Sequence, residues 1–155
     1  MHQTYRGFTL IETLIVLGIV VVLITIATVN FNSSRDKKAL QVLGQDIVFA
    51  LEEAKSNAMS GKGGSAYGVR FGTTSYTTFK GSTYNASDVS NVVHTIDSVK
   101  FDLSNTSTGT DGAITFARIT GAANISATTT ISLKSNPGDK FEIYIGILGD
   151  INVVQ

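Results

Sequence analysis

The chain opens with a long apolar run that carries a single charge. From Phe8 to Val29 only Glu12 is charged, and the few other polar side chains are threonines. A helix that crosses a bilayer needs roughly 20 apolar residues, so this run is long enough for one. Because a carboxylate inside such a helix costs on the order of a few kcal/mol, Glu12 indicates a function and needs a partner.

An amphipathic pattern follows the apolar run. Between residues 32 and 60 the apolar side chains recur at intervals of three or four, which is the helical period. These residues are Leu40, Leu43, Ile47, Leu51, Ala54 and Ala58. No proline lies between residues 8 and 60, the polar stretch 32–34 is where a helix would bend or be recapped, and the glycines of 61–64 end it. The pattern predicts one long helix whose second half packs on a globular domain.

From Ser65 onward the apolar period changes to two, which is typical of strands. The strand candidates are 67–71, 76–80, 92–96, 99–103, 113–117, 131–134 and 141–147, with a last short one at 151–153. Turn residues separate them at 72–75, 111–112, 136–139 and 149–150. Many short strands after one long helix predict an α+β fold, with an antiparallel sheet packed on that helix.

Composition narrows the classes of function. The formal net charge is zero and no basic block is present, so bulk charge favours neither nucleic acid nor an anionic membrane. The chain has no cysteine, which excludes disulfides.

Residues with catalytic or ligand chemistry are sparse. His94 has no catalytic or zinc-binding spacing around it and is interpreted as structural. Oxygen ligands for calcium occur at 105–111, Asp139 and Asp150, but turn formation is the favoured reading of these residues. The glycines of 61–65 follow a helix rather than a strand, so they do not match a phosphate loop. We expect no catalytic, cofactor-binding or metal-binding residue.

The segment Gly7-Phe8-Thr9-Leu10-Ile11-Glu12 resembles the processing signal of type IV prepilins and of the pseudopilins of type II secretion and competence systems. The resemblance implies that a membrane prepilin peptidase cuts after Gly7 and methylates the new N-terminus at Phe8. It also implies assembly through the helix, in which the amine of Phe8 on one subunit attracts Glu12 of a neighbour. The expected divisions are a leader at 1–7, a transmembrane and assembly helix at 8–31, an amphipathic helix half at 32–60 and a β-rich globular domain at 61–155.

Two other interpretations of the apolar run are weaker. A secretory signal peptide is cut after its apolar region at a small-residue site, which residues 30–35 match poorly. A plain membrane anchor explains the apolar run but not Glu12.

The charges that flank the apolar run conflict with the motif over membrane topology. Three basic residues follow the run, Arg35, Lys37 and Lys38, whereas only Arg6 precedes it. By the positive-inside rule this distribution favours an extracytoplasmic N-terminus. The processing motif requires a cytoplasmic N-terminus, and we follow the motif.

The expected function is therefore that of a structural subunit, not an enzyme, in a type IV pilus or a type II secretion pseudopilus. The expected location is the cytoplasmic (inner) membrane, single-pass with an extracytoplasmic domain, and then the filament. The implied partners are other pilin or pseudopilin subunits, the prepilin peptidase, an inner-membrane assembly platform and membrane lipid. The strand-rich region 61–155 also resembles the minor pseudopilin and minor pilin branch.

Two alternatives from other classes stay open. The first is a minor pilin for DNA uptake that binds double-stranded DNA, although the turn at 148–151 carries Asp150 and no arginine. Binding that fades as salt rises would identify it. The second is a membrane-anchored enzyme, which would need a deep pocket with convergent polar groups.

Overall fold

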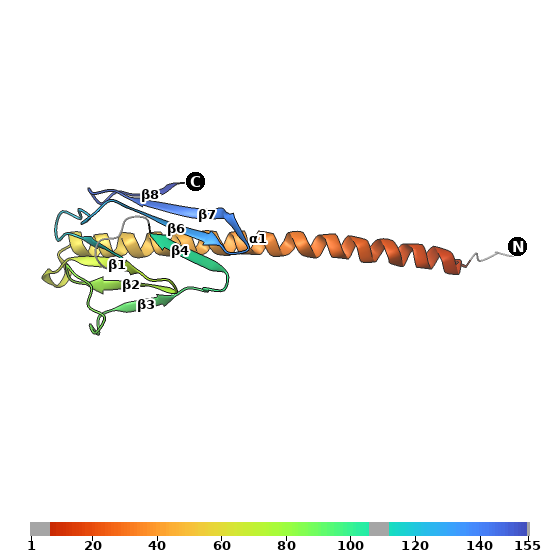
Figure 1. Ribbon diagram of the computed structural model, residues 1–155, viewed down its shortest axis with the longest axis horizontal. Coiled ribbons are helices and arrows are strands. Elements are labelled where there is room, and N and C mark those ends of the chain that lie inside the picture. The colour runs from red at the N-terminus through yellow and green to blue at the C-terminus, as the bar shows by residue number, and fades with distance from the viewer. Residues whose placement is uncertain (1–6, 106–111, 155) are drawn as a thin grey trace, which may run out of the picture. The chain divides into compact units, whose positions relative to one another are not determined.

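The structure is a computed structural model that describes residues 7–105 and 112–154, leaving aside the side chains of 26–33 and 105. Figure 1 shows one long helix followed by strands. The chain divides into two compact units, Met1–Asp36 and Lys37–Gln155, which are described separately below. The predicted leader at 1–7 lies outside the described residues except for Gly7.

Helix α1 runs from Leu10 to Met59. The backbone stays helical through residues 32–34, so the helix is not recapped at the polar stretch. It ends where predicted, because Gly61 adopts a left-handed conformation with φ of 65° that side chains other than glycine rarely tolerate. A short 3₁₀ turn, η1, covers Lys62–Gly64.

The strands form two four-stranded sheets, and each strand pairing in both sheets is antiparallel. One sheet has the order β3-β2-β1-β5 and the other the order β4-β6-β7-β8. The strands of the first sheet are β3 (Val92–Thr95), β2 (Ser75–Lys80), β1 (Tyr67–Phe71) and β5 (Ala113–Phe116). Those of the second are β4 (Phe101–Asn105), β6 (Ala127–Leu133), β7 (Asn136–Ile145) and β8 (Ile151–Val154).

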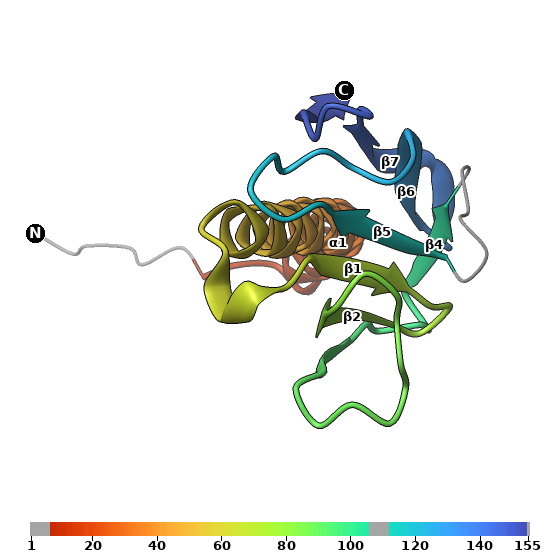
Figure 2. The same cartoon turned by 90° about the vertical axis from the view of Figure 1, so that its left-hand side faces the viewer.

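The core of the second unit lies between the two sheets and the inner face of α1. Five of the six predicted inward positions on the helix are buried, and the sixth, Leu43, is partly buried against the core. Ile47 is fully buried, as are Phe116 and Ile131 from the two sheets. Figure 2 shows the labelled strands on one side of this helix segment. The α+β class and the packing of antiparallel strands on the helix are therefore confirmed.

One predicted turn is wrong. The turn expected at 136–139 lies instead at Lys134 and Ser135, and β7 begins at Asn136, which pairs with Leu133. The pairing then shifts, because Ser132 faces Lys140, so the intervening residues form a bulge rather than the turn itself. Pro137 is tolerated there because a bulge at the start of a strand does not need its missing N–H.

Smaller differences concern strand boundaries. β4 begins at Phe101 rather than residue 99, and β7 ends at Ile145, which leaves Ile147 exposed outside the strand. β6 is longer than predicted and starts at Ala127. The turn expected at 111–112 lies partly outside the described residues.

Candidate functional site

The start of α1 is organised by Thr9. The backbone N–H of Glu12 donates to the Thr9 hydroxyl oxygen at 3.3 Å, and that of Thr13 donates to the Thr9 carbonyl oxygen at 3.3 Å. Thr9 is therefore the N-cap, and Glu12, three residues later, completes the spacing of a capping box. Sequence reasoning missed this role of Thr9, although the Thr-x-x-Glu spacing was there to indicate it. A carboxylate in the first turn also interacts favourably with the helix N-terminus.

The predicted processing junction, between Gly7 and Phe8, is exposed. Both residues precede the helix, and the Phe8 side chain is 80% exposed. Nothing lies within 4 Å of the position that a Cβ on Gly7 would occupy. The junction is accessible in the folded chain, and the fold itself makes no steric demand for glycine at position 7.

The predicted assembly residues Phe8 and Glu12 lie on the same side of the chain. Together with Thr13, Val16 and Leu17 they line a shallow groove of about 390 Å³. Phe8 precedes the helix and Glu12 lies in its first turn, so the groove spans the junction between the non-helical N-terminal residues and α1. The structure thus brings together the residue that would become the N-terminus and the single carboxylate of the apolar run.

The apolar side chains around this groove are uncovered. Every large apolar residue recorded from Leu10 to Ile24 is at least 42% exposed. Within the part of the chain that the structure describes, no helix offers an apolar stretch of the length that a membrane crossing requires. The span predicted from the sequence stays a prediction.

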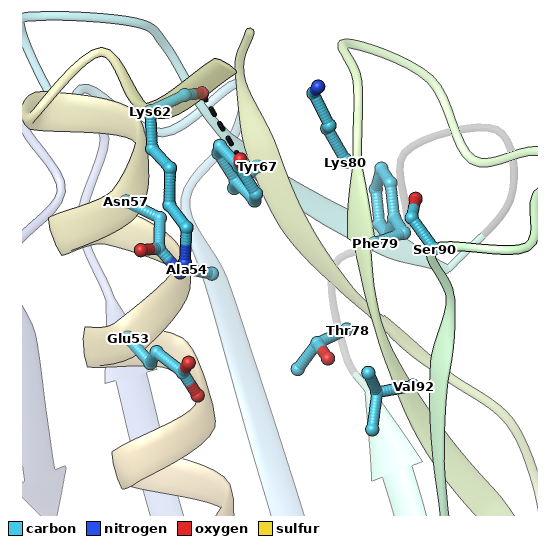
Figure 3. A pocket seen from close by; sticks show the side chains of 10 residues that line it. All are labelled: Glu53, Ala54, Asn57, Lys62, Tyr67, Thr78, Phe79, Lys80, Ser90 and Val92. Carbon is cyan, nitrogen blue, oxygen red and sulfur yellow. Dashed lines mark hydrogen bonds between the residues drawn. The ribbon is translucent and has the colours of Figure 1, made fainter.

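A half-open pocket of about 250 Å³ lies between α1 and the first sheet of the second unit. Figure 3 shows it between the end of the helix and strands β1 to β3, with the Tyr67 hydroxyl donating to the Lys62 carbonyl oxygen at 3.1 Å. The amines of Lys62 and Lys80 point to different sides of the cavity (Figure 3). Its polar groups do not converge on one point, so this cavity gives the enzyme hypothesis no support.

His94 packs against Tyr76, which agrees with a structural role for the histidine. Its ring stacks on Tyr76 with centroids 4.7 Å apart and an interplanar angle of 6°, and the two residues face each other across β2 and β3. Among the described residues no group of three or more His, Cys, Asp or Glu side chains is placed to hold a metal ion. Most of the loop considered for calcium, residues 106–111, lies outside the described residues.

A short segment near the N-terminus matches a known family model. Residues 3–28 match the prokaryotic N-terminal methylation motif. This region contains Gly7, Phe8 and Glu12, the residues that carry the resemblance to prepilins. No curated protein matches the sequence.

Solved structures extend the comparison to about three quarters of the chain. The chain is similar to the type IV minor pilin FimU of Pseudomonas aeruginosa (strain PAO1) in two crystal forms. With the P65 form the TM-score is 0.58 at 16% identity, covering 75% of this chain and 93% of that one. With the P21 form the TM-score is 0.61 at 15% identity, covering 76% and 90%. At this identity the likeness concerns the fold. The chain therefore carries the N-terminal methylation motif at its start and has a fold similar to that of this minor pilin.

Proposed function

We propose that the chain is a non-enzymatic structural subunit of a type IV pilus or of a related pseudopilus. It is anchored in the cytoplasmic membrane with its globular domain outside, processed after Gly7, and assembled through the first half of α1. The observation that carries the proposal is the exposed Gly7–Phe8 junction beside Glu12, at the head of an uncovered apolar helix. Other pilin subunits, a prepilin peptidase and an assembly platform are the partners that this function requires.

The role of Glu12 in assembly is an electrostatic attraction between its carboxylate and the Phe8 amine of a neighbouring subunit. Cleavage after Gly7 creates a positive amine on Phe8, on the same groove as the Glu12 carboxylate. In an apolar bundle each of these charges loses hydration, and an opposite charge from a neighbouring subunit offsets part of that cost. A lone subunit can hold Glu12 near the N-terminus of its own helix, where the Thr9 cap already orients the first turn. Assembly then exchanges this local interaction for one between subunits.

N-terminal mass analysis of the membrane-extracted protein tests processing. We expect the loss of residues 1–7 and one added methyl group on Phe8. Gly7→Val should block the cut, because a β-branched side chain crowds the scissile peptide, whereas the fold has room for it. An intact Met1 in cells that contain an active prepilin peptidase would refute the proposal.

Substitutions at Glu12 test assembly separately from processing. Glu12→Gln nearly keeps the shape and removes the charge, and Glu12→Ala removes the side chain and makes the helix more apolar. We expect both variants to be cleaved and membrane-bound, yet recovered poorly in sheared filaments. If only the Gln variant assembles normally, a hydrogen bond is sufficient. If both assemble normally, Glu12 has no part in the mechanism.

A further inference from the structure

Strand β3 lies at one edge of the first sheet and offers unpaired backbone groups there. The backbone N–H of Ile96 donates to the Thr74 carbonyl oxygen at 2.9 Å, which continues the register of β2 and β3 by one residue. Because the bonding direction alternates along an antiparallel strand, His94 also bonds toward β2, whereas Val93 and Thr95 direct their N–H and C=O groups away from it. Among the described residues, no hydrogen bond is recorded for these outward groups.

The fold leaves this edge open although it covers the opposite one. The range 89–96 contains no charged side chain and no proline, the residues that usually keep an edge strand from pairing with another chain. Val92 is 53% exposed and Val93 is 61% exposed, on opposite faces of the strand. At the opposite edge, the Thr115 N–H of β5 donates to Asn124 Oδ1 at 2.9 Å, and the Thr115 carbonyl oxygen accepts from the Asn124 N–H at 2.9 Å. Only the β5 edge is thus closed by the chain's own residues among those described.

The exposed groups around β3 are arranged symmetrically about His94. Val89 and Val99 lie five residues before and after it, and at 102% and 84% they are the most exposed large apolar residues recorded in the second unit. Val93 and Thr95, with their outward backbone groups, lie one residue before and after it. A two-fold axis at His94 therefore brings each set to the same end of the contact as its counterpart in a second copy. Such an edge is complementary to itself.

We propose that β3 is a docking edge for a second copy of this chain, paired antiparallel with His94 opposite His94. In this register Val93 of one copy faces Thr95 of the other and exchanges backbone hydrogen bonds with it, so the two sheets join into one. A register with Val93 opposite Val93 would place Asn91 opposite Thr95. It is disfavoured, because the Asn91 N–H already donates to the Asp88 carbonyl oxygen at 3.2 Å.

This contact differs in kind from assembly through the start of α1. Both copies use the same edge, so the contact closes with two copies instead of continuing from subunit to subunit. Figure 1 shows β3 running alongside the docked half of α1, and the two-fold axis that makes the strands antiparallel also reverses that half of the helix. Subunits of one filament, as proposed above, share a direction. The β3 contact therefore joins units that belong to different filaments.

The mass of the full-length protein in a mild detergent, which covers the apolar half of α1, tests the pairing. We expect light scattering to give the protein mass of a dimer. Val93→Pro removes an N–H that no bond within the sheet uses, and Val93→Lys places a charge on the edge, so both should be monomers with the unfolding curve of the parent. Leu148→Lys, at a residue 80% exposed outside β3, is the matched control and should remain a dimer. A monomeric parent, or a dimer that persists in both Val93 variants, overturns the inference.

Cysteine cross-linking tests the register, since the chain contains no cysteine. In the proposed pair the His94 residues form a non-hydrogen-bonded pair with Cα atoms about 4.5 Å apart, within reach of a disulfide. Under mild oxidation we expect His94→Cys to give a covalent dimer, at least several-fold more than Val93→Cys or the control Val89→Cys, whose copies lie at opposite ends of the contact. A dominant Val93→Cys dimer would show the other register and overturn the proposal. Neither measurement needs a filament, so failure here leaves the proposed function standing, and absence of the chain from filaments would refute that function alone.

Discussion

A glycine in the buried half of α1 allows a sharp test of how the helix docks. A Cβ built on Gly44 would meet the ring of Phe141, with Cε1 at 2.7 Å and Cγ and Cδ1 also in contact. Phe141 belongs to β7, where it pairs with Ile131 of β6, so its backbone is held in the second sheet. Close approach of helix and sheet at this point therefore depends on the absence of a side chain at position 44.

Gly44→Ala sets two effects against each other. Alanine favours the helix by about 1 kcal/mol relative to glycine. Overpacking a core contact costs roughly 1–3 kcal/mol. Phe141 is only partly buried and borders an open groove, so its ring has some room to turn, and we take about 2 kcal/mol for the clash. The expected net change is a loss of about 1 kcal/mol, or about 4 °C in Tm for a domain of this size.

Thermal and urea unfolding of a chain that begins at residue 32 would measure this change. Ser56→Ala on the exposed face is the control for helix propensity alone and should raise stability by a few tenths of a kcal/mol, about the difference between the two residues. In a Phe141→Leu background Gly44→Ala should lose its penalty, because the coupled partner has been reduced. A Gly44→Ala protein that melts above the parent would refute the close packing of α1 on β7.

Two further predictions concern the same unit. Ile47→Asp places an unpaired carboxylate at a fully buried position, so we expect a loss of several kcal/mol in the free energy of unfolding, and a melting curve like that of the parent would mean that this helix half is not docked. Burial, with a smaller effect of the nearby Asp46 charge, raises the pKa of Tyr76 above its usual 10.0. The folded state then holds this proton more tightly than the unfolded state, so stability should be unaffected below about pH 10 and fall above it, relative to Tyr76→Phe. Urea unfolding between pH 8 and 11.5 measures the difference, and equal slopes for the two proteins would contradict it.

Periodicity was sufficient to predict the helix and its buried stripe because these depend on local geometry. A period near 3.6 places residues such as Leu40, Ile47 and Leu51 on one face whatever they pack against, and the structure buries all three. Phe8 precedes the helix, so its position on the same groove as Glu12 does not follow from this period. Gly7, Phe8 and Glu12 could nevertheless be named from the sequence, because their spacing resembles the prepilin processing signal.

Features that depend on contacts between residues distant in the sequence could not be predicted from it. Asn136 to Asp139 have strong turn chemistry, but pairing of Leu133 with Asn136 takes the turn two residues earlier. Asp139 is then held by Lys37 of α1, a residue about a hundred positions away in sequence. The division of the strands into two sheets and the fit of Phe141 over Gly44 are likewise set by tertiary packing, for which no short pattern exists.

Glycine can be required at a position by the fold or by a partner protein, and three glycines of this chain allow the two reasons to be separated. Gly61 is required by its left-handed backbone, and Gly44 by the ring of Phe141. At Gly7 neither reason applies, because its surroundings are open and it lies outside the helix. A substitution there should leave the stability of the unit Lys37–Gln155 unchanged. If Gly7→Val nevertheless abolishes processing, the need for glycine must come from the enzyme that cuts the chain, and the loss cannot be attributed to misfolding.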